Sequence, residues 1–419
     1  MTEPQTLTIE TLTIDRLGAH GDGIFDAADG AIFVAGSLAG ETVRVEIAED
    51  HNGRRGRLLE VVDPSPHRVV PVCRHFGTCG GCLLQMMSPD AYRDWKRDAV
   101  VETFRQRGIE AEVLPVVAVP PASRRRAVFA VRREGGKLHV GFRERLAHTV
   151  IDIEECAILR PALIEALPRL RRLAEPLSVP KKGATMVVTE TLTGLDVAIN
   201  DAEFAAASRQ SLLKMTLDLG FARLSINGEI IVERIAPQID IGGVAVAPPP
   251  GAFLQAVVDA EAVMADRVLA AVGKAKRVAD LFCGVGTFAL RLARRAHVHA
   301  VESDKNAVAA LDRAARFATG LKPLTVEARD LYRRPMFAPE LKNFDAVVFD
   351  PPRDGAAAQC KELAKSAVPL IVAVSCNPTT LARDARYLID AGYQMSAVEP
   401  IDQFLFTPHI ELVATFRKK

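Results

Sequence analysis

The sequence lacks any apolar run approaching the roughly 18 residues that a helix needs to cross a membrane. Its first residues, Met1 to Gln5, show neither the basic start nor the apolar run of a secretory signal. An excess of one charge is also missing, because 53 Lys and Arg residues face 52 Asp and Glu residues. These absences exclude a membrane span and a uniformly basic nucleic-acid coat, and they predict a cytoplasmic protein. A local basic face is still compatible with RNA binding.

Cysteine is scarce, with seven residues in a chain of 419. In a reducing compartment this odd number does not suit a disulfide framework. Cys73, Cys79 and Cys82 form a cluster, whereas the other four cysteines are scattered along the chain. A cluster with scattered partners predicts a metal site and leaves room for a catalytic thiol.

The length of the chain predicts two or three domains. Residues 1–63 contain short alternating strands separated by Gly-rich turns, which predicts a small β-barrel of the OB type. The stiff segment Asp63 to Pro66 marks the first boundary. Residues 64–250 mix helical and alternating stretches and are expected to form an α+β central domain. The run Pro248 to Gly251 marks the second boundary.

Residues 251–419 have a different rhythm, because apolar strands alternate with helical stretches. The expected strands are Val278–Phe282, Val298–Val301, Ala346–Phe349 and Leu370–Val374, with a last strand over Ile410–Phe416. This alternation is typical of an α/β fold with a doubly wound, Rossmann-like parallel sheet.

A glycine-rich loop follows the first of these strands and opens a helix. Gly284 and Gly286 allow the backbone to turn sharply and to approach a ligand. Glu302 ends the next strand, where a carboxylate can accept hydrogen bonds from the hydroxyls of a ribose. The loop alone suits NAD, S-adenosylmethionine or an ordinary strand–helix turn. Only one doubly wound unit follows it, which disfavours the two halves of a dinucleotide fold.

Two further segments stand at the ends of strands of the same sheet. Asp350 to Arg353 follows the fourth strand, and Ser375 to Pro378 follows the fifth. Ligands of open α/β sheets bind at the carboxyl ends of the strands, so these segments and the glycine loop predict one crevice. Cys376 is then a candidate nucleophile, although an isolated cysteine is often a small buried hydrophobe.

A thiolate is needed where the accepting carbon is not itself nucleophilic. C5 of uracil is such a carbon: attack of sulfur at C6 makes C5 able to take a methyl group. A base must then remove the C5 proton before sulfur leaves. Glu411, at the start of the last strand, is the candidate base, and His409 is its rival.

Taken together, these motifs resemble the RNA (uracil-5-)methyltransferase family, specifically its branch with an N-terminal TRAM domain and a [4Fe-4S] cluster. The segments that carry the resemblance are Gly21-Asp22-Gly23, Pro71 to Gln85, Phe253-Leu254-Gln255, Asp280 to Phe288, Asp350 to Arg353, Val374 to Pro378 and His409-Ile410-Glu411. Two positions depart from the family pattern, because Val257 replaces a common Asn and Ser123 replaces a common aromatic residue.

The resemblance implies that Cys376 is the nucleophile and Glu411 the base. It also implies contacts with S-adenosylmethionine from Gln255, Phe282, Thr287, Glu302, Asp330 and Asp350, in addition to Gly284 and Gly286. Structured RNA is the implied substrate, with 23S ribosomal RNA as the first candidate and transfer RNA as the second. Amino-group methylation of RNA and a non-catalytic iron–sulfur RNA-binding protein are the alternatives from other classes. We expect a monomer.

The cysteine cluster needs a fourth ligand, and Cys156 is the only remaining cysteine outside the C-terminal domain. Glycines between Cys79 and Cys82 let backbone N–H groups approach sulfur. Four thiolates suit zinc or a [4Fe-4S] cluster, and spacing alone does not decide between them. The resemblance favours the [4Fe-4S] cluster, in a structural or RNA-positioning role. Unligated cysteines are the plain alternative.

Basic residues in the central domain interleave with aromatic ones. They are Arg124 to Arg126, Arg132, Arg133, Arg143 and Arg145, with Phe129 and Phe142 among them. This pattern predicts phosphate contacts and base stacking, with a solvated charged face as the alternative. The target base must leave any stack to meet Cys376, so base flipping is expected.

Overall fold

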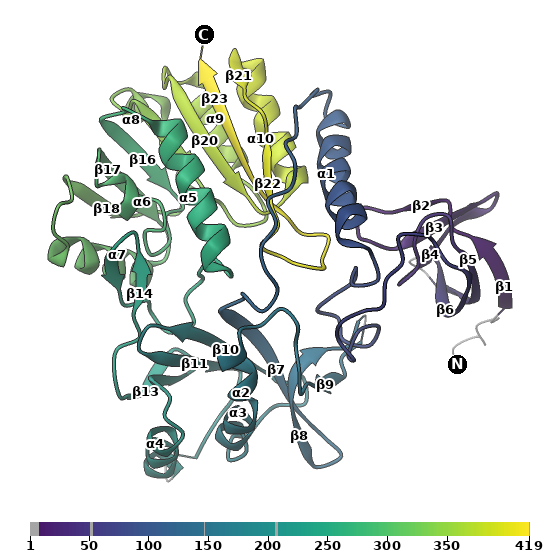
Figure 1. Cartoon of the computed structure of the whole chain (residues 1–419). Helices are drawn as coiled ribbons and strands as arrows, with labels where there is room; N and C mark the ends of the chain where they lie inside the picture. The colour runs from purple at the N-terminus through teal and green to yellow at the C-terminus, as the bar shows by residue number, and fades with distance from the viewer. Residues whose placement is uncertain (1–7, 51–52, 146, 206–207, 419) are drawn as a thin grey trace.

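The computed structural model of the chain describes residues 8–50, 53–145, 147–205 and 208–418. In the described residues, three large sheets follow one another along the sequence, with a two-stranded hairpin between the second and the third (Figure 1). None of the helices in these described stretches is both long and apolar enough to cross a membrane.

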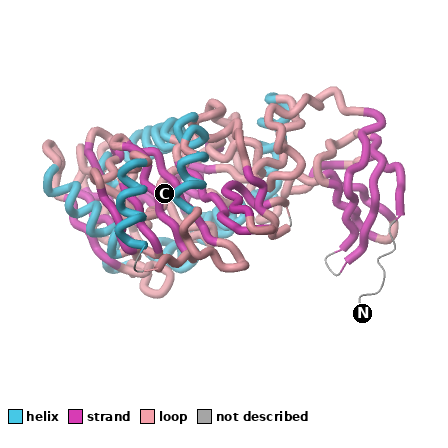
Figure 2. The backbone as a smooth tube through the Cα atoms, turned by 90° about the horizontal axis from the view of Figure 1, so that it is seen from below, coloured by secondary structure: helices cyan, strands magenta, loops and turns pink. Residues whose placement is uncertain are grey.

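The N-terminal region forms a six-stranded sheet in the order β1-β5-β6-β4-β3-β2. Its strands are β1 (Thr8–Thr13), β2 (Arg16–Leu17), β3 (Gly23–Ala27), β4 (Gly30–Val34), β5 (Thr42–Asp50) and β6 (Gly53–Asp63). Alternating residues such as Ile32, Val34 and Val45 are buried and form a separate small core. This sheet projects to one side of the molecule (Figures 1 and 2). The region is therefore rich in β-structure as expected, and its TRAM-like barrel character stays a prediction.

The central sheet has seven strands in the order β13-β12-β11-β10-β7-β8-β9. They are β7 (Arg126–Glu134), β8 (Lys137–Arg143), β9 (Val150–Asp152), β10 (Ala184–Thr191), β11 (Gly194–Asn200), β12 (Arg223–Ile226) and β13 (Glu229–Glu233). The helices α2 (Pro161–Glu165), α3 (Leu167–Ala174) and α4 (Arg209–Asp218) accompany it, and leucines of α3 are buried in its core.

The C-terminal sheet has the order β18-β17-β16-β19-β20-β23-β21, with β22 paired to β23. Its strands are β16 (Arg277–Leu281), β17 (His297–Glu302), β18 (Leu324–Ala328), β19 (Ala346–Phe349), β20 (Leu370–Ser375), β21 (Tyr393–Met395), β22 (Glu399–Ile401) and β23 (Glu411–Lys418). Strands β16 to β20 are mutually parallel, and β23 runs antiparallel to β20. The expected doubly wound α/β sheet is confirmed.

Helices cover both faces of this sheet, which gives it two cores. The helices are α5 (Val258–Val272), α6 (Ala289–Leu292), α7 (Lys305–Phe317), α8 (Ala338–Leu341), α9 (Ala357–Lys365) and α10 (Pro378–Asp390). Residues of α5, α6 and α7 pack on one face, and residues of α8, α9 and α10 on the other.

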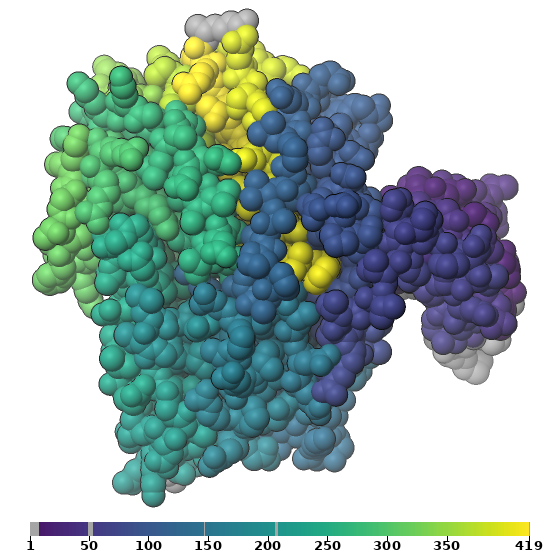
Figure 3. All heavy atoms as spheres, in the orientation of Figure 1, coloured from purple at the N-terminus to yellow at the C-terminus, as the bar shows by residue number. Residues whose placement is uncertain are grey.

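Two segments of the predicted central domain also pack on the C-terminal sheet. Val100 and Phe104 of α1 (Pro89–Arg105) enter the core that α9 and α10 share. The hairpin of β14 (Ile239–Ile241) and β15 (Val244–Val246) enters the opposite core. In Figure 3, blue atoms of the earlier segment surround a yellow patch from the C-terminal part of the chain. The chain thus crosses between sheets more than once, and the boundaries at 63 and 250 stay predictions.

Candidate active site

The glycine-rich loop leaves the carboxyl end of β16 in a strained conformation. Phe282 has a positive φ of 60°, and Gly284 and Gly286 have φ values of 54° and 102°. A Cβ atom on Gly286 would lie 2.5 Å from the Cδ1 atom of Leu311. Only glycine therefore allows the loop to pack this closely against α7.

Carboxylates flank this loop at the ends of the neighbouring strands. The Oε2 atom of Glu302 accepts a hydrogen bond from the N–H of Gly284 at 3.0 Å, so the carboxylate is fixed beside the loop. Asp330 follows β18 and accepts a hydrogen bond from the N–H of Tyr332 at 2.9 Å. The rings of Tyr332 and Phe282 lie 5.6 Å apart. Thr287 stands where the loop turns into α6, and together these groups suit a ligand with a ribose and an aromatic base.

The register of β20 and β23 brings the candidate nucleophile and base together. Ser375 pairs with Leu412 across the antiparallel ladder, so the next position places Cys376 opposite Glu411. Burial raises the pKa of the Cys376 thiol to about 12, and the carboxylates of Glu411 and Asp350 add to the rise. The charge of Arg353 opposes it and favours the thiolate.

Two buried amides connect the carboxylates of this site. The Nε2 atom of Gln255 donates to Oδ2 of Asp350 at 2.9 Å. The Nε2 atom of Gln403 donates to Oε1 of Gln255 at 2.6 Å and to Oε1 of Glu411 at 2.7 Å. We call these four residues and Cys376 the catalytic edge. Its side chains come from four separate segments and meet only in the folded protein.

The two carboxyl groups of the catalytic edge resist ionisation. Burial raises the pKa of Glu411, and the nearby charge of Asp350 adds to the rise. Burial also raises the pKa of Asp350, against the hydrogen bond from Gln255. A buried carboxyl with a raised pKa can take up a proton near neutral pH, which is the property that a general base requires.

The rival base is less suited to that role. Burial and, to a smaller extent, the charges of Arg353, Lys96 and His20 together lower the pKa of His409 to about 4. Its ring meets the ring of Phe404 edge-on, with centroids 6.1 Å apart. A group with so low a pKa holds a proton poorly at neutral pH.

Three residues important to this site escaped sequence analysis. Gln403 carried no motif of its own. Asp280 at the end of β16 is fully buried, and neither of its oxygens has a hydrogen-bond partner among the described residues. Lys96 of α1 is 1% exposed and pairs with Asp402, while its Nζ atom donates to the carbonyl of His409 at 2.7 Å. Nothing in the sequence marked Lys96 for this last contact.

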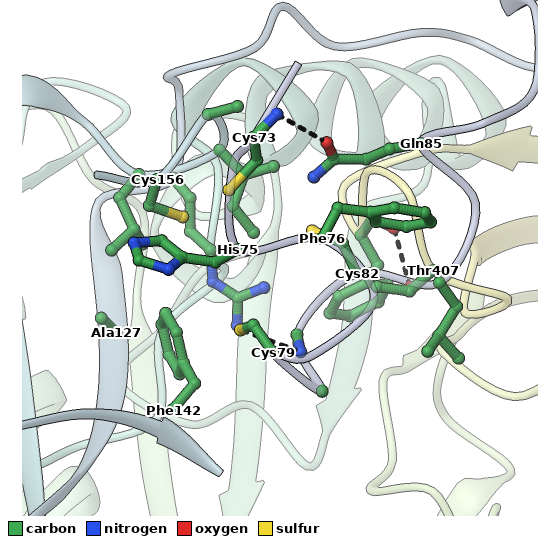
Figure 4. A pocket seen from close by; sticks show the side chains of 18 of the residues that line it. Cys73, His75, Phe76, Cys79, Cys82, Gln85, Ala127, Phe142, Cys156 and Thr407 are labelled. Atoms are coloured by element: carbon green, nitrogen blue, oxygen red, sulfur yellow. Dashed lines mark hydrogen bonds between the residues drawn. The ribbon is translucent and has the colours of Figure 1, made fainter. Parts of the chain in front are cut away.

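The four cysteines of the predicted metal site line one cavity of about 320 Å³, which we call the cysteine pocket (Figure 4). Cys73, Cys79 and Cys82 come from one loop, and Cys156 enters from beyond β9. The N–H of Gly81 lies 3.5 Å from the sulfur of Cys79, as the glycine spacing predicted. In the described part of the chain, no three His, Cys, Asp or Glu side chains are close enough to hold one metal ion.

The cysteine pocket adjoins the catalytic edge. Arg353, Thr407 and His409 form part of its wall. The N–H groups of Leu83 and Leu84 donate to the carbonyl of Phe406 at 2.8 and 3.1 Å. The loop that carries three cysteines is therefore bonded to the loop that leads to Glu411.

Among the predicted RNA-contact arginines, some form ion pairs within the protein and others are exposed. Arg125 is buried, and its Nη2 atom donates to Oε2 of Glu261 on α5 at 2.7 Å. The prediction of a phosphate contact is wrong for Arg125, because its charge is used to join the central sheet to α5. Arg145 pairs with Asp22 of the N-terminal sheet. Arg143, at the end of β8, is exposed.

Comparison with known proteins agrees with this geometry. The family model described as tRNA (Uracil-5-)-methyltransferase matches residues 235–419. A Rhizobium meliloti protein described as an uncharacterized RNA methyltransferase is 50% identical over 97% of this chain and 99% of its own. A 23S rRNA (uracil(1939)-C(5))-methyltransferase of Alkalilimnicola ehrlichii is 34% identical over 97% of this chain and 96% of its own.

A solved structure supports the same assignment over the whole fold. The Pyrococcus abyssi tRNA (uracil-54, C5)-methyltransferase, in complex with S-adenosyl-L-homocysteine, is 26% identical with a TM-score of 0.78. The match covers 97% of this chain and 99% of that one. Fold and site thus define an α/β methyltransferase that depends on S-adenosylmethionine. More narrowly, the chain belongs to the RNA (uracil-5-)methyltransferase family.

Proposed function

We propose that this enzyme methylates C5 of a uridine in 23S ribosomal RNA, with Cys376 as nucleophile and Glu411 as base. The observation that carries the mechanism is the register of β20 and β23, which sets these two residues opposite each other beside the glycine loop. The choice of ribosomal RNA is supported by the 34% identity to an enzyme with that named substrate, against 26% to the one named for transfer RNA. Transfer RNA is the second candidate.

The chemistry follows from the side chains. The Cys376 sulfur adds to C6 of uracil, and the electrons of the C5–C6 double bond make C5 nucleophilic. S-adenosylmethionine, when bound, supplies the methyl group that C5 accepts. Glu411 then takes the C5 proton, the double bond reforms, and sulfur leaves as thiolate. Arg353 favours the thiolate form at both ends of this cycle.

The cofactor residues predicted from the sequence are proposed to hold S-adenosylmethionine at the carboxyl ends of the strands. They are Gln255, Phe282, Gly284, Gly286, Thr287, Glu302, Asp330 and Asp350. Support comes from the fixed carboxylate of Glu302 beside the glycine loop and from the Asp330 turn after β18.

The cysteine pocket is proposed to hold a [4Fe-4S] cluster through Cys73, Cys79, Cys82 and Cys156. A single zinc ion needs its sulfur ligands at about 2.3 Å. Among the described residues no such convergence occurs, whereas the four thiols surround a cavity of about 320 Å³. The choice of a cluster over a single ion rests on this separation of the thiols together with the family resemblance of the cysteine spacing. Burial raises the pKa of the Cys82 thiol to about 12, and coordination to the iron of a bound cluster would favour its thiolate.

Anaerobic purification tests this proposal. Iron and acid-labile sulfide should co-purify with the protein, and alanine at any one of the four positions should remove both. Alanine at the buried Cys360 is the matched control and should keep the cluster. Stoichiometric zinc without iron would contradict the cluster.

Trapping of the covalent intermediate tests the mechanism. Glu411→Gln should accumulate a denaturant-stable complex between RNA and protein that carries the transferred methyl group, because sulfur cannot leave until the C5 proton has gone. RNA containing 5-fluorouridine should trap the unmodified enzyme in the same way. Normal turnover by Glu411→Gln with no trapped complex would remove Glu411 as the base. Mapping of methylated uridines in 23S and transfer RNA, with and without the gene, decides the substrate.

A further inference from the structure

Gln403 occupies a central position in the catalytic edge that the mechanism above does not use. Its side chain is 2% exposed and makes three hydrogen bonds at once. The Oε1 atom accepts from the N–H of Ala256 at 3.1 Å, and the Nε2 atom donates to Gln255 and Glu411. Every hydrogen-bonding group of this amide except one acceptor lone pair is thus engaged.

The Ala256 contact fixes which way the amide faces. A backbone N–H can only donate, so the atom of Gln403 that meets it must be the carbonyl oxygen. Both N–H bonds of Gln403 then have to point toward acceptors, which are the Oε1 atoms of Gln255 and Glu411. The same chain of contacts turns the Nε2 atom of Gln255 toward Asp350. The N–H of Ala256 therefore determines the orientation of both amides, those of Gln403 and Gln255.

The two oxygens of Glu411 are consequently unequal. Oε1 accepts the hydrogen bond from Gln403 at 2.7 Å. Oε2 is buried and has no hydrogen-bond partner among the residues that the structure describes. We propose that Gln403 is a positioning residue that commits Oε1 of Glu411 to the amide and leaves Oε2 as the oxygen that takes the C5 proton. This inference rests on the proposed function of Glu411.

The step balances with the groups present. The C5–H bond of the methylated adduct breaks, and its proton forms a bond with Oε2. The electron pair left on C5 forms the C5–C6 double bond, and the C6–S bond breaks with its electrons going to the Cys376 sulfur. Gln403 neither gains nor loses a proton in this step.

The amide also affects how readily Glu411 ionises. Its hydrogen bond lowers the pKa of Glu411, against the rise caused by burial and by Asp350. The other charged group that acts on Glu411 is Arg353, after β19, which lowers the pKa of Glu411 and also that of the Cys376 thiol. Loss of the Gln403 donor should therefore raise the pKa of Glu411 further and move its action as a base to higher pH.

Single-turnover measurement on Gln403→Met tests the proposal, because methionine has a similar length and no donor. The covalent complex should form at nearly the rate of the unmodified enzyme, and its decay to product should slow by roughly 10- to 100-fold. The rise of the decay rate with pH should also move to higher pH. Gln359→Met is the matched control, since Gln359 is also fully buried but bonds to Met336 away from the site.

The outcomes separate this inference from the proposed function. If Glu411→Gln traps the complex but Gln403→Met releases RNA with unchanged rate and pH profile, Glu411 is the base and Gln403 does not position it. If Glu411→Gln traps nothing, the proposed function itself fails. Should Gln403→Met not fold, Gln403→Leu carries the test, because leucine also has no hydrogen-bond donor. Its decay should slow in the same direction, and unchanged decay would overturn the inference.

Discussion

The catalytic edge and the cysteine pocket adjoin each other, but their side chains are arranged differently. Side-chain hydrogen bonds connect four residues of the catalytic edge, whereas the four thiols of the cysteine pocket line a cavity. At the catalytic edge, the amides of Gln255 and Gln403 each donate a hydrogen bond to one carboxylate oxygen, of Asp350 and of Glu411 respectively. In the cysteine pocket, four thiols face a cavity without reaching one another closely enough to hold an ion. Hydrogen bonds between side chains hold the catalytic edge in place, whereas in the cysteine pocket the proposed [4Fe-4S] cluster would hold the separated thiols together.

The largest expected effect distinguishes the catalytic edge from the cysteine pocket by methylation activity and iron content. Cys376→Ala should lower methylation by roughly 10⁴-fold or more, because no other group can add to C6. The same variant should keep its iron. Cys82→Ala should instead lose its iron. Both variants are compared by methyl incorporation and by iron analysis. Full activity of Cys376→Ala would instead favour amino-group methylation.

The next effect concerns the contact that holds the loop between the sites. Lys96→Met leaves Asp402 buried without its cation, which should cost about 3–5 kcal/mol of unfolding free energy. The control is Arg16→Met, which breaks an ion pair with side chains 56% and 48% exposed and should cost less than about 1 kcal/mol. Denaturant unfolding measures both. Equal costs would show that the Lys96 contact does not hold the loop.

A smaller effect tests the charge of the catalytic edge. The raised pKa of Asp350 means that this carboxyl ionises only as the pH rises through neutrality. A cationic ligand gains from that ionisation, so affinity for S-adenosylmethionine should increase with pH over this range by a few-fold, up to about tenfold. S-adenosylhomocysteine lacks the sulfonium charge and should show a flatter dependence. Calorimetric titration at several pH values checks this, and parallel curves would contradict it.

The smallest effect concerns RNA near the cysteine pocket. Arg143→Ala should reduce the slope of log affinity against log salt by about one, as expected for one lost phosphate contact. Arg125→Ala should leave that slope unchanged, because Arg125 is buried against Glu261. Binding of RNA across a salt series distinguishes them. An unchanged slope for Arg143→Ala would assign it to a solvated surface.

The strands of the C-terminal sheet were predictable because buried parallel strands are continuous apolar runs. The run Val278–Phe282 became β16 with a shift of one residue, and the last strand, expected over Ile410–Phe416, is β23 at Glu411–Lys418. These strands could be predicted because the apolar run that marks each one spans only a few consecutive residues.

Contacts between distant segments were not predictable from one sequence. Gln403 and Gln255 lie 148 positions apart, and Arg125 and Glu261 lie 136 apart. Nothing in a run of three arginines distinguishes a surface that binds phosphate from a junction between domains. A buried charge or amide is recognised only when its partner is known.

The position of β23 between β20 and β21 has a consequence for the order of synthesis. Because the chain grows from its N-terminus, β20 and its cysteine are made before the strand that carries Glu411. The two earlier strands must leave a vacant slot in the sheet that β23 later fills with antiparallel pairing on both sides. In sequence order the proposed nucleophile Cys376 precedes the proposed base Glu411, so the two residues come together only when β23 has entered the sheet.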